Sequence, residues 1–139
     1  MHEQQVTPER PSRASGFTLM EMMIVMALIV ILAGIGMTVY GSSVQRSKEA
    51  VLKEDLFRMR DAIDQYYADK NKYPGSLEDL VSEKYLRAVP VDPFTQSTDS
   101  WQTTTSEPDP GNPSLESGIS NVKSGSEQTG LDGSRYADW

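Results

Sequence analysis

An apolar stretch near the start of the chain, MMIVMALIVILAGIGMTVY, runs from Met22 to Tyr40 and decides the fold. No Asp, Glu, Lys or Arg lies between Glu21 and Arg46. About 20 such residues form a helix long enough to cross a bilayer. A secretory signal peptide has a shorter apolar region of about 7–15 residues, followed by a small-residue cleavage site. This run is longer and its glycines form no such site, so the sequence predicts a retained membrane helix.

Composition excludes several classes of function. The chain has 139 residues, 13 Lys plus Arg, 20 Asp plus Glu, no Cys and one His, with a net charge of −7. This length suits one small domain with appendages. The negative charge argues against a nucleic-acid partner, which needs a basic face. Without Cys there is no disulfide or thiolate zinc site, and the lone His2 excludes a His cluster or a Ser-His-Asp triad.

The helix is predicted to continue beyond the membrane segment. There is no proline from Gly41 to Asn71, and apolar residues recur at steps of 4, 3, 4 and 3, as on one face of an amphipathic helix. We therefore expect one helix from about Phe17 to Asn71. Residues 17–40 form its membrane half, and residues 41–71 pack on the rest of the chain through an apolar face. The stripe consists of Leu52, Leu56, Met59, Ile63 and Tyr66.

Turn signals divide the next part of the chain. Tyr73-Pro74-Gly75 should end the long helix, because proline disfavours helical geometry in the residue before it. Ser76 is the expected N-cap of a short helix over 76–83, which has two acidic residues in its first turn. The two prolines within 89–94 predict a fixed, extended loop.

The C-terminal part is expected to form a small sheet. Trp101–Thr105 and Ile119–Lys123 are β-leaning and predict two antiparallel strands, whereas the rest of 95–123 carries little signal. The predicted fold is α+β, with a long N-terminal helix packed on a small C-terminal antiparallel sheet. Such a head buries little apolar surface, so a further element should fix its C-terminal end.

The junction before the apolar run carries a resemblance. It reads RASGFTLME over residues 13–21, and a G-F-T-L-x-E motif followed by a long apolar run resembles the signal of type IV pilins and type II secretion pseudopilins. The resemblance implies a pilin-like fold and a membrane peptidase that cuts between Gly16 and Phe17 and then methylates Phe17. Residues 1–16 would be a cytoplasmic leader, longer than many in the family, and 41–139 a periplasmic head.

Glu21 places a carboxylate at the edge of the apolar run. A carboxylate at the edge of an apolar segment is costly and usually functional. After cleavage, Phe17 would present a free amine four residues before Glu21. In a stack of parallel helices, one subunit's carboxylate can meet its neighbour's amine, which offsets the cost of burying either charge. The alternative is an interfacial glutamate that reaches the lipid headgroups.

Residues 124–139 mix acidic, hydroxyl and glycine residues. Calcium takes 6–8 oxygen ligands from such loops, but the residues alone fit an ordinary polar loop equally well. The order of K-Y-P, short helix and P-x-D-P resembles major, G-type pseudopilins in particular. That resemblance implies a calcium ion with Glu127 and Asp132 as side-chain ligands, and carbonyls near Ser124 and Thr129 as partners. Glutamate for aspartate and an altered spacing depart from the family pattern.

The resemblance implies a structural subunit rather than an enzyme. Such a subunit assembles with copies of itself into a periplasmic pseudopilus that drives protein export. Its partners would be the prepilin peptidase, minor pseudopilins, an inner-membrane platform, an ATPase and, before assembly, membrane lipid. It would cross the inner membrane once, with its head in the periplasm, before entering a periplasmic or extracellular filament.

Three alternatives stay open. A type IV pilin of an extracellular fibre often has a C-terminal disulfide loop and a proline in the apolar run, and this chain has neither. A membrane-anchored periplasmic binding module would need neither the Gly-Phe junction nor Glu21. An enzyme would need acid–base pairs such as Asp61 and Asp64, which fall on a predicted exposed face without pocket-forming sequence.

Overall fold

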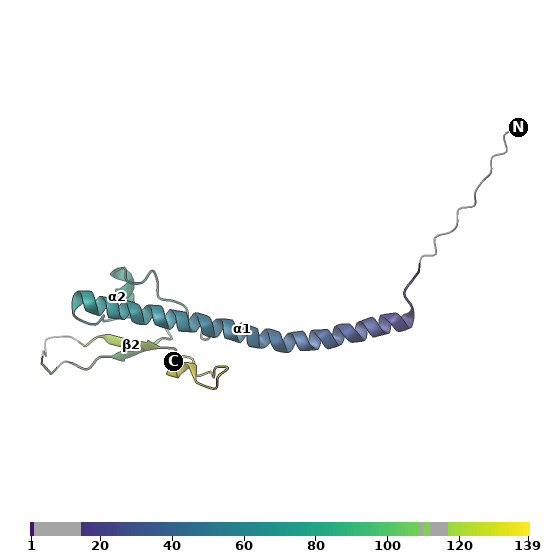
Figure 1. Cartoon of the computed structure of the whole chain (residues 1–139). Coiled ribbons are helices and arrows are strands. Elements are labelled where there is room, and N and C mark those ends of the chain that lie inside the picture. The colour runs from purple at the N-terminus through teal and green to yellow at the C-terminus, as the bar shows by residue number, and fades with distance from the viewer. Residues whose placement is uncertain (2–14, 109, 112–116) are drawn as a thin grey trace. The chain divides into compact units, whose positions relative to one another are not determined.

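The computed structural model of the chain describes residues 1, 15–108, 110–111 and 117–139, so most of the predicted leader lies outside the described residues. The elements are α1 (Leu19–Lys70), α2 (Leu77–Ser82), β1 (Gln102–Thr105), β2 (Ile119–Lys123) and the 3-10 helix η1 (Tyr136–Asp138) (Figure 1). The predicted α+β class is confirmed. The chain forms two compact units, Met1–Thr38 and Val39–Trp139.

In the first unit, α1 begins at Leu19 because Thr18 caps it. The Thr18 Oγ1 atom accepts a hydrogen bond from the Glu21 backbone N–H at 3.1 Å, and the Thr18 carbonyl accepts one from Met22 at 3.1 Å. A threonine hydroxyl in this role satisfies an N–H that has no partner within the helix. The helix therefore starts two residues after the expected Phe17.

The other end of α1 lies at Lys70, just before the predicted breaker. Asn71 has a positive φ of 55°, and its N–H donates to the Tyr67 carbonyl at 2.8 Å. Asparagine tolerates this left-handed conformation and commonly follows the last turn of a helix. The helix thus ends at an asparagine cap, and Pro74 lies beyond it.

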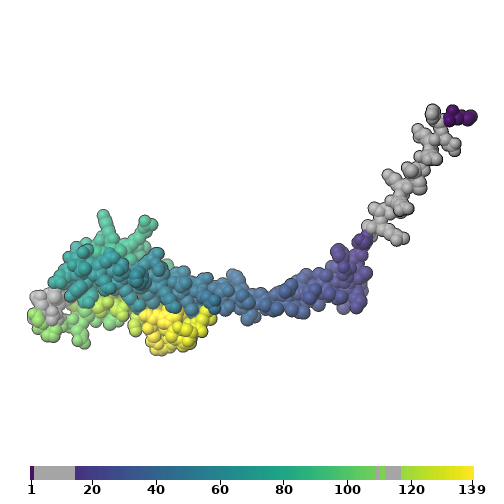
Figure 2. Space-filling model, viewed as in Figure 1, coloured from purple at the N-terminus to yellow at the C-terminus, as the bar shows by residue number. Residues whose placement is uncertain are grey.

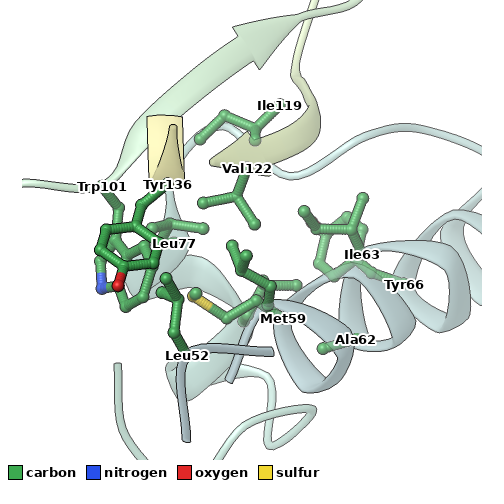
Figure 3. Close-up of a cluster of buried hydrophobic side chains, with 12 residues drawn as sticks. Leu52, Met59, Ala62, Ile63, Tyr66, Leu77, Trp101, Ile119, Val122 and Tyr136 are labelled. Atoms are coloured by element: carbon green, nitrogen blue, oxygen red, sulfur yellow. The ribbon is translucent and has the colours of Figure 1, made fainter. Parts of the chain in front are cut away.

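The hydrophobic core of the second unit is built on the predicted stripe of α1. All five stripe residues are buried, and Ala62 joins them. Figure 3 shows side chains of α1 meeting those of β2 and the C-terminal segment, with Met59 facing Val122. Burying an aliphatic side chain of this size is worth about 1.5–3 kcal/mol relative to exposure. The remaining core residues are Leu77, Leu80, Trp101, Ile119, Val122 and Tyr136.

The short helix α2 confirms the prediction, including its cap. Ser76 Oγ accepts from the Asp79 N–H at 3.3 Å, and Asp79 Oδ2 accepts from the Ser76 N–H at 3.0 Å. This reciprocal capping box satisfies two donors at the helix start. The turn after α2 returns to α1, where the Tyr85 hydroxyl donates to Asp69 at 2.7 Å.

The two predicted strands pair in an antiparallel sheet, with an irregularity between Thr104 and Thr105. All residues of β1 are exposed, whereas β2 buries Ile119 and Val122. The Ile119 N–H donates to the Pro74 carbonyl at 2.8 Å. This bond ties the start of β2 to the segment between the two α-helices.

The loop with two prolines differs from the expectation. The chain turns over 93–95 instead of staying extended, because Asp92 folds it back. Asp92 Oδ1 accepts from the N–H groups of Phe94 at 2.8 Å and Thr95 at 3.3 Å. Asp92 is fully buried, and sequence reasoning did not anticipate a buried carboxylate here.

Candidate functional site

The predicted processing junction is accessible in the first unit. Phe17 is 75% exposed, and Gly16 and Glu21 are exposed as well. A Cβ atom added to Gly16 would meet nothing within 4 Å. The packing of this chain therefore places no demand on a glycine at position 16, and any such demand would come from a partner that binds the junction.

The apolar run that follows is uncovered. Helix α1 is long and apolar enough to cross a membrane, and none of its most apolar window is buried. In Figure 2 this part of the helix, purple to blue, is a rod without a covering layer. Exposed apolar surfaces larger than a few hundred Å² mark membrane or protein contacts. The first unit is thus built to be covered by lipid or by other helices.

The two predicted calcium ligands, Glu127 and Asp132, contact different partners. The Glu127 side chain is 86% exposed, and its carboxylate lies 3.8 Å from the guanidinium of Arg135. Asp132 Oδ1 accepts from the Ser134 hydroxyl at 2.6 Å and the Ser134 N–H at 2.9 Å. These two hydrogen bonds lower the pKa of Asp132.

As arranged, these carboxylates do not fit a calcium ion. Glu127 and Asp132 line two different surface hollows. Within the described part of the chain, no three Asp, Glu, His or Cys side chains gather as a metal site requires. Calcium binding stays a prediction, and it would require Glu127 to leave Arg135 and the loop to rearrange.

Side chains of α1 hold the C-terminal loop instead. Glu49 Oε1 accepts from the Tyr136 hydroxyl at 2.8 Å and from the Leu131 N–H at 2.8 Å. The Gln45 amide donates to the Tyr136 hydroxyl oxygen at 2.9 Å and to the Thr129 carbonyl at 3.2 Å. Burial, the largest cause, raises the pKa of Tyr136, so this hydroxyl stays protonated and can donate.

Gln45 and Glu49 were not predicted as anchoring residues, although their positions in the sequence carry a signal. Counting back from Leu52 by 3 and then 4 gives positions 49 and 45, so these residues extend the core stripe toward the start of the second unit. Polar residues at stripe positions indicate that the facing segment presents polar groups. The facing segment is the backbone of the C-terminal loop.

Further along α1, Arg60 anchors the last residue. Its Nη2 donates to the backbone oxygen of Trp139 at 2.5 Å and to that of Val122 at 2.9 Å. The Lys53 ammonium lies 4.7 Å from the centre of the Trp139 ring, which is cation–π geometry. Two aromatic residues anchor this end of the described chain: Tyr136 is fully buried and Trp139 packs on it edge to face.

The acidic pair Asp61 and Asp64 on α1 is exposed as predicted, but the prediction that no pocket borders it is wrong. Asp61 and Asp64 do border a hollow of about 600 Å³, because Trp139 and the C-terminal loop wall off that face of the helix. The described residues around this hollow include no Ser, Thr, Cys or His that could act as a nucleophile or base partner. The hollow also contains Arg60 and Lys53, which hold the loop.

The junction and the apolar run together match a known motif. The model of the prokaryotic N-terminal methylation motif matches residues 11–37, a range that includes Gly16, Phe17 and Glu21. The type II secretion system core protein G of Pseudomonas aeruginosa is 33% identical over 96 residues, which cover 58% of this chain and 68% of that protein. The chain belongs to the type II secretion system core protein G family.

Further relatives include a second core protein G and a fimbrial protein. The core protein G of Aeromonas hydrophila is 28% identical over 98 residues, covering 59% of this chain and 68% of that protein. A fimbrial protein of Eikenella corrodens is 36% identical over 81 residues, covering 55% of this chain. The chain spans about half the length of that fimbrial protein, 53%. No solved structure matches the chain.

Proposed function

We propose that this chain is the major structural subunit of a periplasmic pseudopilus that drives protein export through a type II secretion system. The observation that carries the proposal is the uncovered apolar half of α1, most of which lies within the methylation motif matched at residues 11–37. A helix of this kind is stable when lipid covers it before assembly and when other subunits' helices cover it afterwards. The function is structural, with no catalytic role.

The proposed path follows from the junction. A prepilin peptidase cuts after Gly16 on the cytoplasmic side and methylates Phe17. The subunit waits as a single-pass inner-membrane protein with its head in the periplasm. Glu21 of one subunit then pairs with the Phe17 amine of its neighbour in the filament, because each charge offsets the burial cost of the other. An inner-membrane platform, an ATPase and minor pseudopilins take part in assembly.

The second candidate is a pilin subunit of an extracellular fibre. The similarity to a fimbrial protein, which is 36% identical over 81 residues, favours it. Both candidates use the same helix and junction. They differ in whether protein export depends on the fibre.

The test replaces the native subunit. The gene is deleted in a bacterium that carries it, and the full chain is returned on a plasmid. Under the proposal, export through the outer membrane stops and is restored, and mass spectrometry of the restored protein finds methylated Phe17 as its first residue. Normal export after deletion, together with loss of a surface fibre, supports the pilin candidate. A mature protein that begins at Met1 contradicts both.

A further inference from the structure

The C-terminal loop directs two hydrogen-bond donors at Glu49 of the helix that holds it. The Leu131 N–H and the Tyr136 hydroxyl converge on one oxygen of Glu49, each at 2.8 Å. A calcium site requires the opposite arrangement, with 6–8 oxygens directed at a cation. At this point of the loop the polarity therefore suits an anion, and Glu49 supplies it.

Close approach of backbone and carboxylate completes this contact. Gly130 is buried, and a Cβ atom there would lie 3.2 Å from Glu49 Oε1 and 3.1 Å from Trp139. Glycine lets the loop backbone reach the carboxylate without displacing either group. The Gly130 N–H donates to the Ser134 carbonyl at 2.7 Å, which closes the turn around this point.

The neighbouring residues make the contact a network. Gln45 donates to the Tyr136 hydroxyl oxygen, which itself donates to Glu49, so the two hydrogen bonds reinforce each other. Phe94 stacks on the Tyr136 ring at 3.9 Å between centroids, and Gln45 and Glu49 are both half-buried. Hydrogen bonds to a charged group in partly buried surroundings are stronger than those between neutral groups.

We propose that Glu49, together with Gln45, holds the C-terminal loop on α1 in the role that a calcium ion would otherwise fill, so that the head folds without metal. The loop then owes its position to a carboxylate on the core stripe, and not to Glu127 and Asp132. This inference concerns the fold of a single subunit and does not rest on filament assembly.

The test measures the thermal midpoint of the full chain in detergent micelles, followed by near-ultraviolet circular dichroism, in calcium and in chelator. The wild-type midpoint is expected to be equal in the two buffers. Glu49→Ala should lower it by on the order of 5 °C or more in both, because two charge-assisted hydrogen bonds are lost. Glu54→Ala is the matched control, since Glu54 is exposed on the same helix and pairs only with Arg58 among the described residues.

If Glu49→Ala fails to fold, the milder variant Glu49→Gln provides the test. Glu49→Gln retains an acceptor oxygen without the charge and should give an intermediate midpoint. In that variant, hydrogen exchange of the Leu131 amide should be faster than in wild type, whether or not calcium is present. A wild-type midpoint several degrees higher in calcium overturns the proposal, as does a Glu49→Ala midpoint equal to that of Glu54→Ala.

Discussion

The Ser124 hydroxyl donates a hydrogen bond of 2.5 Å to Asp92 Oδ2, and both side chains are fully buried. The other carboxylate oxygen of Asp92 accepts from two backbone N–H groups in the turn over 93–95. One side chain thus joins the loop after α2 to the residue that follows β2. Ser124 Oγ in turn accepts from the Ser126 N–H at 3.1 Å, which extends the network into the C-terminal loop.

Asp92→Ala should destabilise the head by about 3 kcal/mol, because it leaves three buried or half-buried donors without an acceptor. Ser124→Ala should cost less, about 2 kcal/mol, since it removes one donor to Asp92 and the acceptor of the Ser126 N–H but leaves the two backbone bonds to Asp92 in place. Urea unfolding of the full chain in micelles measures both. Asp99→Ala, at an exposed position in the same loop, is the control and should stay near wild type. A neutral Asp92→Ala would contradict a structural role for this carboxylate.

Gly125→Ala tests how closely the segment after β2 approaches the segment before β1. A Cβ atom at Gly125 would collide with the carbonyl oxygen of Ser100, which is backbone and cannot rotate away. We expect a loss of about 1–3 kcal/mol, as for other overpacked sites. Gly41→Ala is the control, because a Cβ there meets nothing within 4 Å and alanine favours a helix by up to about 1 kcal/mol. Equal thermal midpoints for the two variants would show that the chain adapts to the extra methyl group.

Glu21→Val tests the proposed assembly contact. The variant should insert into the membrane and be cleaved, since the change makes the helix more apolar. Fibre yield should fall strongly, because the neighbour's amine loses its partner, and fibres sheared from cells and quantified by immunoblot give the measurement. Thr38→Val, an apolar change at an exposed position of the same helix, should assemble normally. Normal fibre yield from Glu21→Val would rule out the Phe17–Glu21 pairing.

Gly16→Leu tests the processing site. A side chain at this position should clash in the peptidase, so the full-length precursor should accumulate in the membrane and be detected by its mass. The circular dichroism spectrum should not change, because a Cβ at Gly16 touches nothing in the described chain. Mature protein at the wild-type level would place the cut elsewhere.

The bond between Tyr85 and Asp69 predicts a loss of stability in alkali. This hydrogen bond, helped by partial desolvation, raises the pKa of Tyr85 from 10.0 to about 12. The folded state therefore favours the protonated phenol, and its stabilising effect is present below about pH 10 and is lost as the pH rises toward 12. The thermal midpoint of wild type should exceed that of Tyr85→Phe at pH 8, and the difference should shrink at high pH. A difference in midpoint that is constant with pH would show that the Tyr85–Asp69 hydrogen bond does not stabilise the folded state.

Local patterns in the sequence were sufficient to predict the long helix, its apolar half and the strand Ile119–Lys123. Periodicity reports which face of an element is buried, and it needs no knowledge of the partner. The capping box at Ser76 was equally readable, because its two members lie three residues apart. In each case the interacting groups are close in sequence.

Local patterns did not predict the contacts between segments that are distant in the sequence. Glu49 and Tyr136 are separated by 87 positions, and Asp92 and Ser124 by 32. A carboxylate in a sequence is ordinarily taken as exposed, because burying it is costly without several donors. Those donors are supplied only when the loop folds back on α1. The chain's own periodicity thus dictates which residues form helix and strand, whereas tertiary packing decides which polar side chains become internal anchors and which, like Glu127, stay in solvent.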